Sequence, residues 1–400
     1  MARQITVGID IGTSQVKAII AEGSVQDGHL VPKIIGAGSA ESKGLERGYI
    51  TSAAEAADSI RLAVSRAEKA SGVKARRAYV SFGGIGLGSI KSEGSTAISR
   101  ADMEITERDL SAVLEAAEQS LPTTATRNRR IINTVPVEHK IDGHAVWGEA
   151  LGLKAQKLEA KTLFITCLEH HLAELIKAVE TAGLEVVDVV AAPVAASFVT
   201  VSKKERRVGC LLADIGAETL SIIVFENGNP VSLEVFPVGG SDVTNDLALG
   251  LKLPLEDAEN AKIGGLARSP YSKKKLEEIV SARLGDCFEL IENHLKKIGR
   301  DSLLPAGIIL TGGTASLAGI RTFAEEFLGL PARIAEIHFG TSEKNRMRDN
   351  IWATACGLAL LGFNSGERNG LSGGSRNHLS PLSGSGFMRR INRFLSQLLP

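Results

Sequence analysis

An internal repeat is the feature that most constrains the fold of this chain. Residues 5–20 consist of an apolar strand, the tripeptide Asp-Ile-Gly, a polar turn and a second apolar strand, and residues 208–225 repeat that order. The aspartates of the two copies, Asp10 and Asp214, lie 204 positions apart (214 − 10). Helical segments alternate with strands around both copies. The repeat therefore predicts an α/β protein with two lobes of the same fold.

Length and charge predict a multi-domain protein with a basic tail. Four hundred residues exceed what one hydrophobic core usually serves. From Asn364 onward the chain has five basic residues and one acidic residue, a net of +4, which leaves 41 basic and 45 acidic residues, a net of −4, in the body. Such a body has no charge excess that would attract nucleic acid, whereas the tail suits anionic lipid.

The cysteines and the hydropathy pattern indicate a cytoplasmic protein. The four cysteines are widely separated and show no CxxC spacing, so we expect buried thiols in a reducing compartment. The chain enters a strand at once, without a signal peptide. No run of about eighteen apolar residues occurs, so we expect any membrane contact to be peripheral.

Changes in composition along the chain predict five parts. A glycine-rich stretch, a helix and a strand interrupt the first lobe and predict an inserted α+β subdomain. Gly and Ser supply twelve of the 23 residues that precede the last segment, which predicts a flexible linker. The predicted parts are a first lobe (1–82 and 162–205, with a connecting helix at 350–363), the inserted subdomain (83–161), a second lobe (206–349, with a smaller subdomain at about 228–305), the linker (364–386) and a terminal helix (387–400).

The terminal segment is amphipathic. On a helix its apolar side chains fall on one side and its three arginines on the other, with no acidic residue. Such a helix binds at the surface of an anionic membrane. The alternative is a helix that docks on the protein's own body or on a partner. The residues predicted to contact the membrane are Phe387, Arg389, Arg390, Ile391, Arg393, Phe394, Leu395 and Leu398.

The first copy of the repeat has the residues of a phosphate-binding turn. Asp10 ends a buried strand, Gly12 allows a sharp turn, Thr13 and Ser14 offer hydroxyl and N–H groups, and Lys17 follows. An aspartate beside such a turn commonly holds hydrated Mg²⁺. An ordinary hairpin would use the same Asp and Gly as turn formers, so one copy alone leaves both interpretations open.

The second copy favours a phosphate site. Asp214, Gly216 and Thr219 repeat the arrangement, so two loops facing each other could grip one triphosphate, with Mg²⁺ bound through water to both aspartates. A third segment, Thr311-Gly312-Gly313, follows a strand directly, and its glycines would let a base and ribose approach the backbone. No GxxxxGK[ST] motif is present, so a P-loop is excluded.

In this order the three segments resemble the nucleotide-binding motifs of the actin, Hsp70 and sugar-kinase superfamily. Residues 191–196 and 352–357 are similar to its two connecting helices. Within it, the sequence most resembles the bacterial cell-division FtsA family, because of the insertion, the tail and the runs at 238–248 and 257–264. The resemblance implies a duplicated actin-like (ribonuclease H-like) fold.

The resemblance also implies further site residues. Gly239 and Gly240 would lie near the phosphates, and Glu259 and Lys262 near the ribose. From the residues alone, the last two form an exposed i,i+3 pair on a helix. Glu218 departs from the family pattern, which has a small residue there, and a carboxylate near the γ-phosphate would repel it.

The resemblance implies a function in division. It predicts an ATP- and Mg²⁺-binding protein that self-assembles into filaments, binds the C-terminal tail of FtsZ on the smaller subdomain, tethers FtsZ to the inner membrane face and recruits later division proteins. No general base for attacking water is evident, so we expect weak or negligible ATP turnover. The alternatives are a pilus-assembly homologue like PilM and a sugar or metabolite kinase.

Overall fold

The computed structural model describes residues 4–26, 29–146, 148–264, 273–339 and 349–366. The predicted terminal helix and all but the first three residues of the predicted linker lie outside these ranges. Residues 364–366 belong to the helix α11 (Ala353–Gly366), so this helix ends three residues later than predicted. Within the described ranges, no helix has both the length and the apolarity needed to cross a bilayer.

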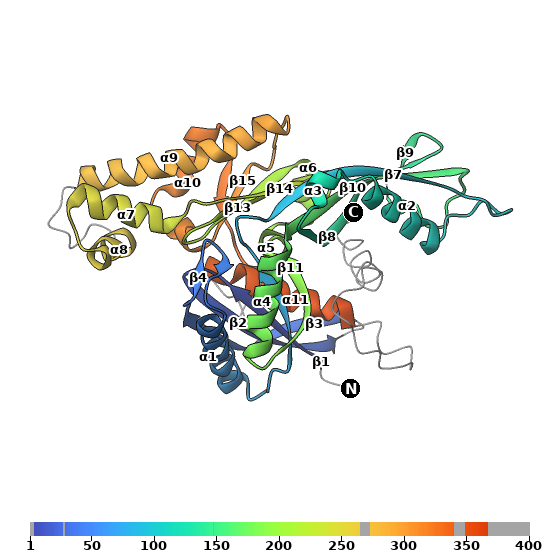
Figure 1. Ribbon diagram of the computed structural model, residues 1–400. Coiled ribbons are helices and arrows are strands. Elements are labelled where there is room, and N and C mark those ends of the chain that lie inside the picture. The colour runs from blue at the N-terminus through green and yellow to red at the C-terminus, as the bar shows by residue number, and fades with distance from the viewer. Residues whose placement is uncertain (1–3, 27–28, 147, 265–272, 340–348, 367–400) are drawn as a thin grey trace.

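Two five-stranded units of the same order form the two lobes (Figure 1). In each unit the first three strands in sequence pair antiparallel, the fourth pairs parallel with the first, and the fifth pairs parallel with the fourth. The predicted duplication is therefore confirmed. The first unit has the order β11 (Glu185–Ala191), β6 (Arg77–Phe82), β1 (Gln4–Ile11), β2 (Gln15–Gln26) and β3 (His29–Glu41); the second has β16 (Ala332–Ile334), β15 (Ile308–Thr311), β12 (Cys210–Ile215), β13 (Leu220–Glu226) and β14 (Asn229–Phe236).

The two repeat turns have the same geometry. Ile11 pairs with Val16, and Ile215 pairs with Leu220, so both members of the second pair lie 204 residues beyond those of the first. The N–H of Gly12 donates to the carbonyl of Gln15 at 3.2 Å, and the N–H of Gly216 donates to that of Thr219 at 2.8 Å. The sequence repeat is thus a structural repeat at its turns.

The helices of the first lobe pack closely on glycines of its sheet. The helix α1 (Ala53–Ser71) lies against β3, where a Cβ on Gly38 would come within 2.2 Å of the Ala63 carbonyl oxygen. The helix α4 (Glu169–Thr181) packs beside α1. The 3₁₀ turn η4 (Asn350–Trp352) leads into α11, which packs on β1, while α5 (Ala192–Thr200) contacts β12 and β13 of the second lobe. These are the two predicted connecting helices.

The inserted subdomain extends the sheet of the second lobe. Its strands continue that sheet beyond β14. Ser89 Oγ links the insertion to the second lobe, because it donates to the Leu233 carbonyl at 3.0 Å and accepts the N–H of Leu233 at 2.8 Å. The predicted boundary at residue 162 falls inside a strand that pairs along its whole length with the insertion. The elements of the insertion are β7 (Gly88–Ala97), α2 (Glu107–Gln119), α3 (Thr123–Thr126), β8 (Arg129–Ile141), β9 (His144–Val146) and β10 (Lys157–Leu168).

The smaller part of the second lobe is helical. It begins later than predicted, because β14 belongs to the main sheet and the first helix starts at Gly240. Its core includes Val243, Leu247 and Leu276. Figure 1 places this part and the inserted subdomain at opposite ends of the molecule. Its helices are α7 (Gly240–Leu251), α8 (Leu255–Gly264) and α9 (Lys273–Lys297); α6 (Lys203–Val208), α10 (Ile320–Leu328) and the hairpin β4 (Leu45–Glu46) and β5 (Tyr49–Ile50) complete the fold.

Candidate functional site

The first repeat loop is built around Asp10. Its carboxylate accepts hydrogen bonds from Lys17 Nζ at 3.1 Å and from Ser81 Oγ at 3.0 Å. Ser81 Oγ also accepts the N–H of Ile11 at 3.0 Å. The pairing of β1 with β2 places Lys17 opposite Asp10, so one hairpin supplies both the carboxylate and its cation. The side chain of Lys17 is buried, which fixes this charge pair at the base of the loop.

The second repeat loop places a carboxyl group near the first. Burial, and then the charge of Asp10, raise the pKa of Asp214 to about 6, against the opposing effects of Lys17 and of a hydrogen bond from Thr354. The two aspartates therefore interact across the lobes, because a neighbouring negative charge disfavours ionisation. The structure brings these two predicted residues together.

This pair of carboxylates fits a hydrated magnesium ion. Within the described residues, no three His, Cys, Asp or Glu side chains gather as a metal-binding cluster. Mg²⁺ keeps several waters and takes one or two carboxylates together with substrate phosphates. Asp10 and Asp214, which share one lysine, are such a donor set, and their mutual repulsion would be relieved by a cation.

Glycines line the second loop where its backbone is approached most closely. A Cβ on Gly239 would lie 2.5 Å from the Ala217 carbonyl oxygen, and one on Gly240 would lie 2.5 Å from Thr314 Oγ1. The N–H of Gly240 donates to the Gly216 carbonyl at 2.9 Å, which seats the start of α7 on the loop. These predicted glycines therefore meet at one place.

Lys262 folds back onto the same helix start. Its ammonium donates to the Gly240 carbonyl at 2.9 Å and to Thr244 Oγ1 at 2.8 Å, and it forms an ion pair of 2.6 Å with Glu259. The Lys262 side chain is 10% exposed and that of Glu259 41%. The interpretation as a simple surface pair is thus wrong for Lys262, which ties α8 to the beginning of α7.

The third segment is only partly accessible. Thr311 is fully buried, and its hydroxyl donates to the Asn350 carbonyl, so its side chain is not available to a ligand. Gly312 has φ 87°, and a Cβ there would lie 2.4 Å from an Asp214 carboxylate oxygen. Gly313 is exposed, and a Cβ there would meet nothing closer than Ile351 at 3.8 Å. Of the three, Gly313 presents the open backbone surface.

A short turn between β4 and β5 bridges both loops, and the sequence analysis missed it. The N–H of Gly48 donates to Thr13 Oγ1 at 3.2 Å, and the N–H of Arg47 donates to the Glu218 carboxylate at 2.7 Å. Ser14, next to Thr13, is exposed. Glycines at 44 and 48 around a short polar turn were the available signal, but they do not say which loops the turn touches.

Two supporting hydroxyls were also missed. Ser81 and Thr354 bond Asp10 and Asp214 from β6 and α11, each far from its partner in sequence. No local spacing connects a residue to a partner 71 or 140 positions away (81 − 10 and 354 − 214). Only the sheet order and the connecting helix bring these side chains beside the two aspartates.

Sequence comparisons identify the family. The profile described as "Cell division protein FtsA" matches residues 211–357, and the one described as "SHS2 domain inserted in FTSA" matches residues 84–166. A cell division protein FtsA of Pseudomonas aeruginosa is 31% identical over 391 residues, covering 92% of this chain and 91% of its own. That of Borreliella burgdorferi is 33% identical over 356 residues, covering 84% and 85%. The chain belongs to the FtsA family.

This FtsA-family protein has an actin-like fold. A solved PilM–PilN type IV pilus biogenesis complex contains a chain that is 19% identical, covers 90% of this chain and 99% of its own, and has a TM-score of 0.65. MreB5 of Spiroplasma citri, solved bound to ADP, is 14% identical with a TM-score of 0.50 over 90% of this chain and 96% of its own. The protein is thus a cell-division protein of actin-like fold, and the matched SHS2 region covers the insertion.

Proposed function

We propose that the protein binds ATP with Mg²⁺ in the cleft between its two repeat loops and acts as a membrane-associated, self-assembling scaffold of cell division. The convergence of Asp10 and Asp214 with the glycines around Gly240 carries this proposal. The solved MreB5 that shares the fold is bound to ADP, which supports a nucleotide as the ligand.

The residues of the two repeat loops would have different roles in binding the nucleotide and its Mg²⁺. Mg²⁺, when bound, would neutralise phosphate charge. Asp10 and Asp214 would hold its water shell, Lys17 would bind the Asp10 carboxylate, and the exposed Ser14 would face the phosphates. None of these groups organises an attacking water, so we propose slow turnover, with binding serving assembly.

Gly313→Val tests the nucleotide site. Open space above Gly313 should admit the base, so a branched side chain there should block ATP and ADP binding without unfolding the protein. Gly88→Val is the matched control. Gly88 lies in the strands of the inserted subdomain, and a Cβ there would meet only Arg129, at 3.9 Å. Isothermal titration calorimetry measures binding, and thermal melts check folding. Wild-type protein that binds neither nucleotide would refute the proposal.

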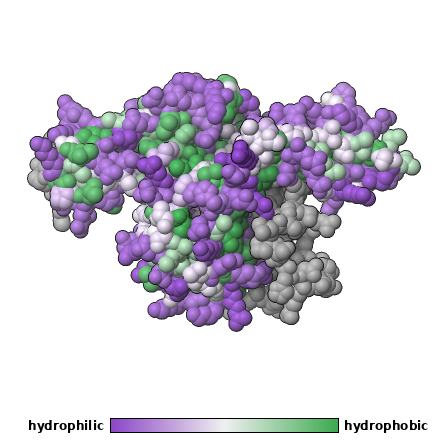
Figure 2. Space-filling view, in the orientation of Figure 1, coloured by the Kyte–Doolittle hydropathy of each residue, from purple (hydrophilic) through white to green (hydrophobic). Residues whose placement is uncertain are grey.

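Exposed apolar residues at the two ends of the molecule support self-assembly. Leu249, Leu255 and Ile263 are 79%, 60% and 71% exposed on α7 and α8. Met103 and Leu153 are 43% and 42% exposed in the insertion. Figure 2 shows apolar surface at both ends of the view. Two different patches that pair head to tail generate an open filament when the rotation between subunits does not close into a ring.

The terminal helix would attach such filaments to the inner membrane face. One short helix binds a bilayer only marginally, but a filament presents many, and avidity can multiply affinity by roughly 10²–10⁴. Phe394→Glu should reduce co-sedimentation with anionic vesicles, whereas Ser396→Glu, which places the same charge on the polar side, should reduce it less. Equal pelleting of wild type and Phe394→Glu would remove this role from the tail.

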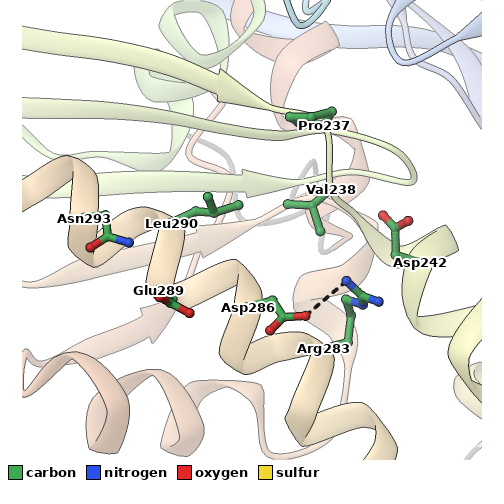
Figure 3. A pocket seen from close by; sticks show the side chains of 8 residues that line it. All are labelled: Pro237, Val238, Asp242, Arg283, Asp286, Glu289, Leu290 and Asn293. Atoms are coloured by element: carbon green, nitrogen blue, oxygen red, sulfur yellow. Dashed lines mark ion pairs between the residues drawn. The ribbon is translucent and has the colours of Figure 1, made fainter.

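A pocket of about 350 Å³ beside α9 is the proposed docking site for the FtsZ tail (Figure 3). Pro237, Val238 and Leu290 give it apolar walls, and Asp242, Arg283, Asp286 and Glu289 give it charged ones. Such lining suits a peptide with an apolar residue beside a basic one. A labelled FtsZ tail peptide should lose affinity for Val238→Glu and keep it for Leu303→Glu, an exposed leucine elsewhere. A PilN-type peptide that binds in its place would favour the PilM-like alternative.

A further inference from the structure

Glu218 makes a contact between the lobes at the mouth of the cleft. Its carboxylate, from the second repeat loop, accepts the N–H of Arg47 at 2.7 Å, although the two residues are 171 positions apart. The side chain is partly exposed, so the contact lies at the solvent edge of the cleft rather than in the core. The carboxylate therefore points toward the first lobe.

The turn that Glu218 contacts has the backbone conformation of an anion-binding turn. Arg47 and Gly48 both have left-handed conformations, with φ of 48° and 77°. Successive N–H groups in such a turn form a concavity that binds anions. The first N–H is bonded to Glu218 and the second to Thr13 Oγ1, so each of the two repeat loops supplies one acceptor. An anion held by both loops would lie beside these donors.

The position of the turn is fixed. A Cβ on Gly48 would lie 2.7 Å from the Gly84 Cα, so the backbone at Gly48 packs directly on the segment that enters the insertion. Tyr49, the next residue, stacks on His171 of α4 with ring centroids 3.5 Å apart. The two N–H groups are thus held in place and do not need a ligand to order them.

The charges of the cleft make a third carboxylate unfavourable for phosphate. Asp10 and Asp214 already face each other, with Lys17 as the cation that acts on both. Lys17 and one Mg²⁺ carry three positive charges against the two negative charges of Asp10 and Asp214, and the carboxylate of Glu218 would cancel the one positive charge that remains for phosphate. This effect grows with each phosphate that extends toward the turn.

We propose that Glu218 is a specificity-determining residue of the nucleotide site, whose carboxylate occupies the turn N–H that a terminal phosphate would take and so favours nucleoside diphosphate over triphosphate. The inference rests on the proposed nucleotide site. Removal of this one charge should raise affinity for ATP about tenfold, as expected for a unit charge partly screened by water. Affinity for ADP, which lacks the terminal phosphate, should change less than about threefold.

The experiment compares ATP and ADP dissociation constants, in excess Mg²⁺, for the full chain and three variants. Glu218→Gln removes the charge and keeps an acceptor for Arg47, whereas Glu218→Ala removes both. Glu46→Gln, on the adjacent exposed hairpin position, is the matched control for a change in net charge. We expect both Glu218 variants to shift the ATP/ADP ratio toward ATP and the control to leave it unchanged.

The other outcomes separate the two claims. In one outcome, Glu218→Gln binds both nucleotides as wild type does while Glu218→Ala changes the affinities for ATP and ADP equally. In that case Glu218 only connects the two lobes, and its role in specificity is wrong. An unchanged ratio in both variants, with nucleotide still bound, also overturns the inference but leaves the proposed site intact. If neither nucleotide binds any of the proteins, the proposed function itself fails, and the inference fails with it.

Discussion

Gly357 of α11 packs against the backbone of Ala195 in α5, where a Cβ on the glycine would lie 1.8 Å from the alanine carbonyl oxygen. The two connecting helices therefore touch through bare backbone at this point. Neighbouring positions are also small, with Ala195, Ala196, Ala355 and Ala359 fully buried. The contact requires glycine because any side chain would force the helices apart.

We expect Gly357→Ala to destabilise the protein by about 1–3 kcal/mol, the usual cost of overpacking. Gly285→Ala should change the free energy of unfolding in the opposite direction. That glycine lies inside α9, where a Cβ would meet only Phe327 at 3.9 Å, so alanine should stabilise by about 0.5–1 kcal/mol through helix propensity. Urea unfolding of both variants measures the difference. Equal stability of Gly357→Ala and wild type would contradict the close contact of the helices.

The raised pKa of Asp214 predicts a pH dependence of stability without nucleotide. The folded protein holds this proton up to about pH 6, whereas the unfolded chain releases it near 3.8. Ionisation of the folded form is therefore unfavourable, and stability from this group falls as the pH rises from about 4 to about 6.

Asp214→Asn should consequently gain stability relative to wild type across that window, by between about 1 and 3 kcal/mol at pH 7. Denaturant unfolding at pH 4, 5, 6 and 7 gives the difference. Asp58→Asn changes an exposed position on α1, and its difference in stability from wild type should be the same at every pH. A flat profile for Asp214→Asn as well would show that burial and the charge of Asp10 do not raise the pKa of Asp214. Mg²⁺ with nucleotide should abolish the gain, because the metal favours the ionised carboxylate.

The stack of Tyr49 on His171 predicts a shifted titration. The rings are nearly parallel, at 11°, and desolvation and then the charge of His170 lower the pKa of His171. Tyr49→Ala should raise that pKa toward 6.5 by exposing the imidazole to water. Tyr49→Phe keeps the aromatic ring and should leave the pKa of His171 lowered. NMR titration of the imidazole C–H signals reads this directly.

The two exposed apolar patches predict complementary assembly defects. Leu255→Asp and Leu153→Asp should each prevent filament formation, because each removes one end of a head-to-tail contact. A mixture of the two variants should form dimers through the remaining intact ends but no filaments. Leu62→Asp, which is 48% exposed on α1, should assemble normally. Analytical ultracentrifugation distinguishes these species, and filaments formed by either end variant alone would exclude this interface.

The sequence alone determined the repeat and the two hairpin turns. These features are local: the apolar alternation, the Asp-Ile-Gly turns and the helix periodicity each lie within about twenty residues, where side-chain spacing fixes backbone choice. The predicted connecting helix at 350–363 is found as η4 and α11, and it ends three residues later than predicted. The family resemblance rested on the order of such local segments.

The tertiary structure decided what lies between these segments. The insertion joins the second lobe because the edge of β14 offers unpaired backbone groups, which nothing in residues 83–161 reveals. Thr311 turned inward because a parallel strand between two others is buried on both faces. The partners of Asp10, Asp214 and Glu218 come from distant strands and helices. Such contacts depend on how complete elements pack, and a linear pattern does not encode them.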